Sequence, residues 1–249
     1  MATRHPLELL VRSLELRSPF SEDDRQALLA LPHNLRTLES SSYLVREGEP
    51  PTHCGVLVSG YAYRQKITRA GTRQIIAIHI PGDAVDFQNL LLDTADHSVQ
   101  MLTRGEVALV PRDALRDLTR SSPQIGEAIF VKTLVEAAIF REWVVNVGRR
   151  QAPERIAHIL CELGCRLDAM GLAEGYGYTL PMTQEELGDA AGLTPVHVNR
   201  TLKILAAAGL IVRDRRSISF PDWRKVRDAA DFNERYLHLG VQQYKQAAG

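Results

Sequence analysis

The chain has 249 residues, 45% of them hydrophobic and 24% charged, and its 30 Lys and Arg balance its 30 Asp and Glu. This composition is typical of a soluble globular protein with one large or two ordinary domains. No apolar run approaches the roughly 18–20 residues of a membrane span, and the N-terminus has no signal-peptide pattern. Three cysteines are too few for a disulfide framework, so we expect a reducing, cytoplasmic location without membrane contact.

The first part of the chain changes from a helical to a β-rich pattern. Residues 1–35 look helical, and in FSEDDRQALLAL the cap Ser21 precedes acids in a first turn. Residues 38–111 contain short alternating runs separated by glycines, which enter positive φ at turns without steric cost. This part predicts about eight short strands in an antiparallel barrel or jelly roll.

The pattern is helical after Arg112. Residues 123–147 form one helix candidate that is apolar nearly all round, so it has to be buried on every side. We interpret it as a dimerisation helix whose outer side, including Trp143, meets a second copy. The alternative is a central helix within a larger monomeric domain. Pro153 then begins another helix.

Two short helices follow in TQEELGDAAGLTPVHVNRTLKIL. Thr183 and Glu186 have the spacing of a capping box, and Gly192 suits the left-handed residue that ends a helix. Thr194 caps the second helix and Pro195 occupies its first turn. Apolar residues share one face of this second helix: Val198, Leu202 and Leu205. Polar residues remain on the other: His197, Asn199, Arg200 and Lys203.

The next stretch, AAAGLIVRDRRSISF, reads as strand, basic turn and strand. Arg213, Arg215 and Arg216 lie at or near its tip, and basic residues outnumber acids over residues 194–227. A helix-turn-helix followed by a basic wing predicts DNA binding. The alternatives are a bare helical hairpin, a solvated basic face, or a signalling scaffold whose C-terminal part makes no DNA contact.

The chain resembles the Crp/Fnr transcription regulators. The resemblance rests on Glu47-Gly48-Glu49, Gly60, Gly71, Pro81-Gly82-Asp83 and the motif MTQEELGDAAGLTPVHVNRTLKILAAAGLI. It implies an α+β fold with a cyclic-nucleotide-binding-like sensor domain (1–120), a dimerisation helix (121–150) and a winged helix-turn-helix domain (151–249). A homodimer would bind an inverted repeat in double-stranded DNA through recognition helix 194–208, with RNA polymerase as a candidate partner.

The resemblance and the wing together give a set of candidate DNA contacts. They are Thr183, Thr194, Pro195, Val196, His197, Asn199, Arg200, Lys203, Arg213, Arg215 and Arg216. Arg200 can bond guanine bidentately. Well-known members of the family have Glu at the position of Val196. Valine instead suits contact with a thymine methyl, so the operator should differ there.

The candidate effector pocket departs from that of the cyclic-AMP-binding members. Asp86 and Phe87 stand where those members have Gly-Glu, and His97-Ser98 stand near the place of their phosphate-binding arginine. An acid repels a phosphate and neutral imidazole offers one donor, so we predict no tight cyclic-nucleotide binding. The sequence leaves open another effector, an effector-free scaffold, activation or repression, and the operator.

Other chemistries find little support in the sequence. His158, Cys161 and Cys165 share a helix face, but core packing explains that spacing better than a metal site. An N-terminal cysteine cluster, which marks the iron–sulfur members, is missing. We therefore expect no metal, no cofactor and no enzyme activity. The tail DAADFNERYLHLGVQQYKQ suggests one more helix, with no function assigned to residues 229–249.

Overall fold

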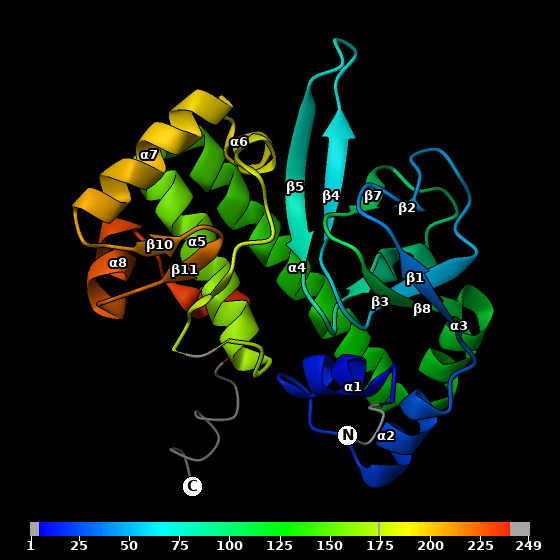
Figure 1. Cartoon of the computed structure of the whole chain (residues 1–249). Coiled ribbons are helices and arrows are strands. Elements are labelled where there is room, and N and C mark those ends of the chain that lie inside the picture. Colours follow the sequence, from blue (N-terminus) through cyan, green and yellow to red (C-terminus); the bar gives the residue numbers. More distant parts are fainter. Residues whose placement is uncertain (1–4, 174, 240–249) are drawn as a thin grey trace, which may run out of the picture. The chain divides into compact units, whose positions relative to one another are not determined.

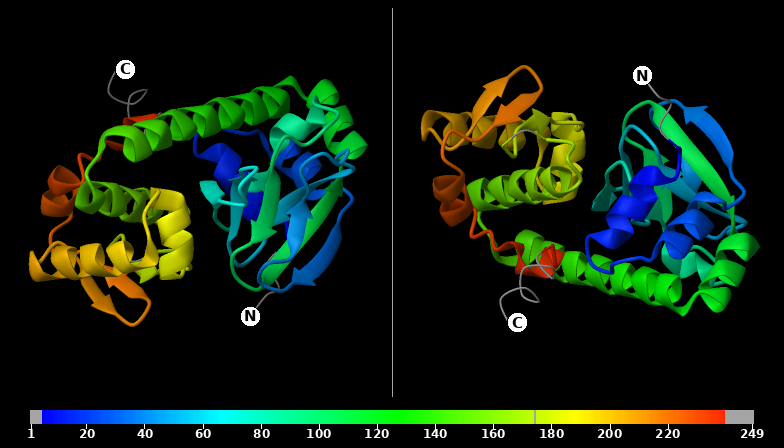
Figure 2. Two further views of the ribbon diagram at one scale, coloured as in Figure 1. Left: turned by 90° about the horizontal axis from the view of Figure 1, so that it is seen from above. Right: turned by 90° about the horizontal axis from the view of Figure 1, so that it is seen from below.

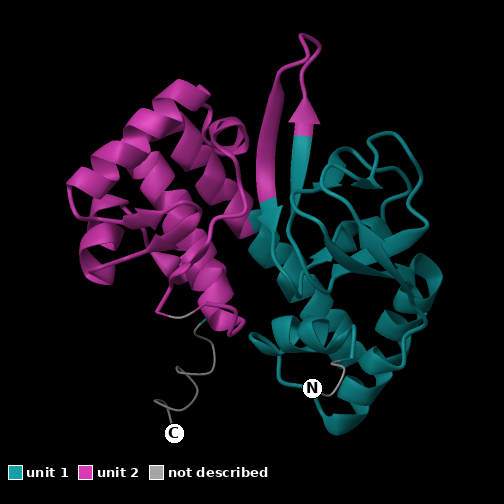
Figure 3. Ribbon diagram, viewed as in Figure 1, with its two compact units in different colours: residues 1–65, 78–137, 238–249 teal, residues 66–77, 138–237 magenta. Residues whose placement is uncertain are grey.

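A computed structural model describes residues 5–173 and 175–239. The chain divides into two compact units (Figure 3). The N-terminal unit comprises residues 1–65, 78–137 and 238–249, and the C-terminal unit comprises residues 66–77 and 138–237. None of the described helices has both the length and the apolar character needed to cross a bilayer.

Apart from β9, the helices and strands follow one another in the order that the sequence predicts (Figure 1). The helices are α1 (Glu8–Glu15), α2 (Glu22–Leu29), the 3-10 helix η1 (Phe87–Leu90), α3 (Arg112–Ser121), α4 (Pro123–Arg149), α5 (Ala152–Ala169), α6 (Gln184–Ala191), α7 (Pro195–Ala207), α8 (Trp223–Ala229) and the 3-10 helix η2 (Glu234–Leu237). The strands are β1 (Asn34–Leu38), β2 (Tyr43–Val45), β3 (His53–Leu57), β4 (Ala62–Ile67), β5 (Arg73–His79), β6 (Ala84–Val85), β7 (Ser98–Met101), β8 (Gly105–Pro111), β9 (Tyr178–Thr179), β10 (Val212–Asp214) and β11 (Ser217–Ser219).

Strands β1–β8 form two four-stranded sheets with antiparallel pairing, in the orders β1-β8-β3-β6 and β2-β7-β4-β5. Apolar side chains from both sheets, including Leu57, Val99 and Met101, form the core between them. A second core lies where Val56 of β3 and Leu115 of α3 pack with residues of α1 and α4. The jelly-roll-like α+β fold is confirmed, but the described strands do not close into a barrel.

Two local predictions in this unit are confirmed. Ser21 caps α2, and its side chain accepts from the backbone N–H of Asp24 in a capping box. Gly60 has a φ of 76°, and a Cβ there would lie 2.8 Å from the carbonyl oxygen of Arg104. Only glycine fits this turn, because a side chain would meet both backbone strain and a clash.

Helix α4 continues without interruption through residues 123–149 (Figure 2). The prediction that Trp143 lies on its outer side is wrong. Trp143 is 4% exposed, and its indole N–H donates to Glu162 of α5 at 3.0 Å. Because α4 is apolar nearly all round, its sequence does not reveal which side faces the rest of its own protomer.

In the C-terminal unit, α5 is the central helix and contacts α6, α7 and α8. Most of α5 is buried, including His158, Cys161 and Cys165. A three-stranded sheet in the order β10-β11-β9 forms the wing, and β9 is a strand that the sequence did not predict. Helix α8 begins before the predicted tail helix. In residues 230–239 the structure contains the short η2, and residues 240–249 lie outside the described part.

Candidate nucleic-acid interface

Local capping determines where α6 and α7 begin and end. The side chain of Thr183 accepts from the backbone N–H of Glu186, and the Glu186 carboxylate accepts from the backbone N–H of Thr183 at 2.7 Å. Gly192 ends α6 with a φ of 64°, and Thr194 caps α7 by accepting from the backbone N–H of His197 at 3.3 Å. The predicted helix boundaries are therefore confirmed. The caps satisfy N–H groups that the first turns leave without intrahelical partners.

The two faces of α7 differ as the spacing predicts. The buried face packs in the C-terminal unit through Val198, Thr201, Leu202 and Leu205. Among the candidate contacts, Val196 is 81% exposed and Asn199 is half-buried. The other candidates on or just before this helix are exposed: Thr194, Pro195, His197, Arg200 and Lys203. A helix packed on one side thus presents an open surface of polar and apolar side chains on the other.

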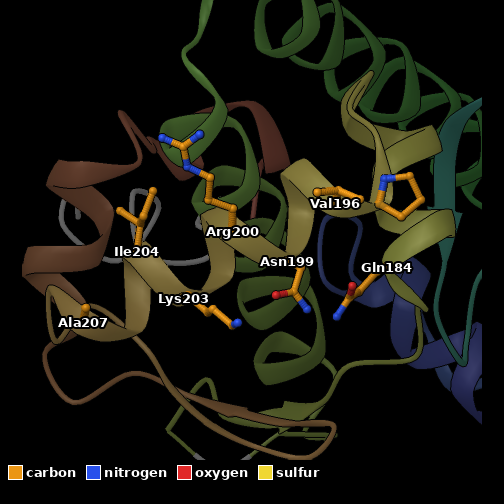
Figure 4. A pocket seen from close by; sticks show the side chains of 8 residues that line it. Gln184, Val196, Asn199, Arg200, Lys203, Ile204 and Ala207 are labelled. Carbon is orange, nitrogen blue, oxygen red and sulfur yellow. The ribbon is translucent and has the colours of Figure 1, made fainter.

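The exposed face of α7 lines an open groove of about 720 Å³. Its lining is Gln184, Pro195, Val196, Asn199, Arg200, Lys203, Ile204 and Ala207. In Figure 4, Asn199 and Lys203 lie along one edge of α7, on the same side as Gln184 from the start of α6, and Arg200 lies along the other edge. Gln184, Ile204 and Ala207 line the groove but are not among the contacts predicted from the sequence. The first-turn position of Gln184 beside the cap Thr183 was the available signal for it.

Three cations on α7 and the wing have no side-chain partner among the described residues. Arg200, Lys203 and Arg216 make no ion pair or side-chain hydrogen bond with any described residue. Farther along, Arg227 pairs with Glu234 at 2.8 Å and Lys225 lies 3.8 Å from Asp222, so these two are partly neutralised. Unpaired cations beside a groove attract the phosphates of a nucleic acid.

The wing extends this positive charge. Arg213, Arg215 and Arg216 are exposed on β10, the turn and its exit. Arg215 has a φ of 52°, and its carbonyl oxygen accepts from Nε of Arg213 at 3.1 Å. The turn thus holds three guanidinium groups within four residues at the tip of a hairpin.

The candidate effector residues of the N-terminal unit separate into two groups. Asp86 is 1% exposed, and its Oδ1 accepts from Nη2 of Arg64 at 2.6 Å and lies 2.8 Å from Nε2 of His97. Phe87 belongs to the apolar core instead, and Ser98 Oγ accepts from the backbone N–H of Glu47 at 3.1 Å. The structure therefore brings Asp86 and His97 together, but commits Phe87 and Ser98 to packing and to a backbone contact.

Electrostatics around Asp86 also involve two residues that sequence reasoning missed. Burial alone raises the pKa of Asp86, but the His97 hydrogen bond and the Arg64 charge outweigh it, so this pKa lies below its usual range. Arg64 also bonds Glu136 of α4 at 3.4 Å. Burial raises the pKa of Glu136 despite the nearby Arg64 and Lys132. The only signal in the sequence for this arrangement was an arginine, Arg64, within a predicted strand.

The His–Cys face of α5 lies in the core. Burial lowers the pKa of His158 to about 3, with the Arg150 charge contributing, and burial raises the pKa of the Cys161 thiol. Within residues 5–173 and 175–239, His, Cys, Asp and Glu form no group of three suited to a metal ion. Packing accounts for these side chains.

Comparisons with known proteins match both units. A family described as the Crp-like helix-turn-helix domain matches residues 154–229, which include α6, α7 and the wing. A second family, described as the cyclic nucleotide-binding domain, matches residues 35–122. These families cover the two segments that the sequence patterns distinguish.

Individual relatives and a solved structure agree with these two family matches. Transcriptional activator protein FnrL of Cereibacter sphaeroides is 26% identical over 78% of this chain and 79% of its own length. Transcriptional activator protein anr of Pseudomonas aeruginosa is 26% identical over 80% and 82%. The structure of FixK2 from Bradyrhizobium japonicum covers 80% of this chain and 98% of its own, with 25% identity and a TM-score of 0.73. The chain therefore belongs to the Crp/Fnr family, whose members include DNA-binding transcription regulators.

Proposed function

We propose that this DNA-binding regulator acts as a homodimer that reads an inverted repeat with two copies of α7. The observation that carries the proposal is the open face of α7, where Asn199, Arg200 and Lys203 have no protein partner among the described residues. Two-fold symmetry would direct two such helices to successive major grooves, about 34–36 Å apart.

Helix α4 supports the dimer. Five of its large apolar side chains are exposed: Phe130 63%, Leu134 51%, Phe140 49%, Val144 57% and Val145 45%. At 3.6 residues per turn these positions fall within an arc of roughly 140°, and Phe140 and Val144 at one edge of it line a small pocket together with the buried Trp143. An exposed apolar stripe of this length on a monomer marks an interaction surface. In a two-fold dimer, α4 of the second protomer would present the same apolar side chains to this stripe.

The side chains on α7 differ in the work that they would do. Arg200 would donate two hydrogen bonds to guanine, Asn199 suits adenine, and Val196 suits a thymine methyl. Lys203 and the wing arginines would contact phosphates, together with the exposed N-terminal residues of α6 and α7. Base contacts specify sequence, and phosphate contacts fix register.

Substitution of the two α7 cations tests this division. Arg200→Ala should weaken binding to the operator by about 1–3 kcal/mol and relax preference at one base pair. Lys203→Ala should weaken binding to all sequences alike and reduce the salt dependence by about one charge. The control is Arg120→Ala, which removes an exposed cation of α3. Selection from random DNA followed by salt titration gives both readouts, and identical behaviour of the two α7 variants contradicts the assignment.

Finer assignments follow from the same proposal. Residues 1–120 would form the sensor domain, 121–150 the dimerisation helix and 151–249 the DNA-binding domain. The protein would act in the cytoplasm, through binding rather than catalysis, with RNA polymerase as a second partner. Mapping the genomic fragments that the purified protein retains would identify the operator.

A further inference from the structure

Four ionisable side chains meet within the N-terminal unit. Arg64 comes from β4, Asp86 follows β6, His97 precedes β7 and Glu136 belongs to α4. Arg64 lies 2.6 Å from Asp86 and 3.4 Å from Glu136, and His97 lies 2.8 Å from Asp86. We call this group the Asp86 cluster. Its members come from distant parts of the sequence, so the fold assembles it.

Within the Asp86 cluster, two donors converge on a single carboxylate oxygen. Nη2 of Arg64 and Nε2 of His97 both face Oδ1 of Asp86, and Gln88 Nε2 adds a third contact at 3.0 Å. Asp86 and His97 are 1% and 4% exposed. A guanidinium and an imidazole aimed at one buried point are the components of an anion site. Here the chain supplies the anion itself.

The backbone of Asp86 also bears the mark of this arrangement. Its φ of 68° and ψ of 50° lie in the left-handed region, which costs a non-glycine residue conformational energy. The carboxylate nevertheless stays at the convergence point of Arg64 and His97. The contacts of the Asp86 carboxylate with Arg64 and His97 offset the energetic cost of this backbone conformation.

We propose that Asp86 is a tethered anion that fills an anion-binding site formed by Arg64 and His97. The wild-type site is therefore closed to diffusible anions. Removal of the Asp86 side chain should open it to a small carboxylate such as formate or acetate. A domain that matches the cyclic nucleotide-binding family thus contains its own anion in place of a soluble one.

Two polar atoms indicate that the tether fits the site incompletely. Oδ2 of Asp86 and Nε of Arg64 are buried and have no hydrogen-bond partner among the described residues. A free carboxylate can rotate and bond with both oxygens to a guanidinium, an arrangement that a backbone-held carboxylate does not reach here. A diffusible anion should consequently bind well once Asp86 is gone.

The occupant of the site also affects α4. Arg64 bridges Asp86 and Glu136, and one turn away Lys132 of α4 pairs with Asp83 at 2.8 Å. Without an anion, Arg64 would lose its closest partner and the contact with α4 would weaken. The filled site should therefore hold α4 on the N-terminal unit without any soluble effector.

Asp86→Gly in the full-length protein is the direct test, because glycine accepts the positive φ and removes only the side chain. We expect the variant to unfold at a lower temperature than the wild type. Formate or acetate should raise its Tm by roughly 5–10 °C relative to chloride at equal ionic strength, once the anion exceeds its Kd about 100-fold. The wild type should show no such selective shift.

Asp231→Gly provides a matched control. Asp231 also has a positive φ, of 46°, and pairs with Arg150 at 3.1 Å, but its side chain is 78% exposed. Its removal leaves no enclosed site, so formate and chloride should act alike. The double variant Asp86→Gly/Arg64→Gln should lose the formate effect, whereas a merely destabilised protein would respond equally with or without Arg64.

Asp86→Asn is the second variant, because asparagine tolerates the left-handed region and fills the space without charge. It should be destabilised but show no rescue by formate. If Asp86→Gly is insoluble, refolding yields are compared in formate and in chloride, and formate should give the higher yield. Equal stabilisation or equal yields in the two salts would overturn the proposal.

Discussion

Thr201, on the buried face of α7, allows a test of how that face packs in the C-terminal unit. Its side chain is 0% exposed, and Oγ1 has no hydrogen-bond partner in the described protein. Burial of an unbonded hydroxyl costs about 1–3 kcal/mol in protein mutational data. Thr201→Val replaces this hydroxyl with a methyl group and keeps a β-branched residue in the helix. We therefore expect the free energy of unfolding to rise by about 1–2 kcal/mol.

Urea unfolding followed by circular dichroism measures this change, provided that the slope of the transition stays the same. Thr201→Ser is the control, because it keeps the hydroxyl and removes the methyl, and it should destabilise the protein. Operator affinity should not change in the valine variant, since Thr201 lies on the face of α7 away from the groove. A valine variant no more stable than the wild type would refute the reasoning, because the hydroxyl would then have a compensating partner.

Three further predictions follow from the structure. Val144→Glu should yield monomers that lose operator affinity, whereas Arg120→Glu, a charge change at an exposed position of α3, should stay dimeric. Sedimentation measures the mass, and a dimeric Val144→Glu would contradict α4 as the interface. Calorimetry with cyclic AMP and cyclic GMP should detect no binding to the wild type, because Asp86 occupies the centre of the charged site, and micromolar affinity for either would contradict this. His158 has a folded pKa of about 3 against an ordinary 6.5, so the unfolded chain binds the proton first and stability falls as pH drops from 6.5 toward 3, by at most about 1.4 kcal/mol per pH unit. His158→Leu should flatten that part of the stability curve relative to the wild type, and parallel curves would contradict the buried neutral histidine.

The parts of the fold that the sequence predicted depend on local chemistry. Thr183, Gly192 and Thr194 define the helix-turn-helix because caps and left-handed residues act within a few positions of the chain. The two-residue β9 has no such local signal, since it forms by pairing with β11, about forty residues away in sequence. Short pairings of this kind depend on the tertiary fold rather than on local propensity.

The candidate sites follow the same rule. The exposed face of α7 follows from helical spacing, so Asn199, Arg200 and Lys203 could be identified as outward-facing residues. The Asp86 cluster could not, because strand register and the packing of α4 bring Arg64 and Glu136 to Asp86. The sequence indicated that an acid at position 86 would repel a phosphate, but it did not indicate which cations neutralise that acid.

The apolar part of the α7 surface has a thermal consequence. Val196 is 81% exposed and Ile204 is 45% exposed, so both are hydrated in the free protein. In the proposed complex, burial of this surface against bases would give association a negative heat-capacity change, and its contribution would weaken on cooling. Added salt weakens the phosphate contacts but not this contribution. Discrimination at the Val196 base pair should therefore persist at ionic strengths that abolish nonspecific binding, and should fade in the cold.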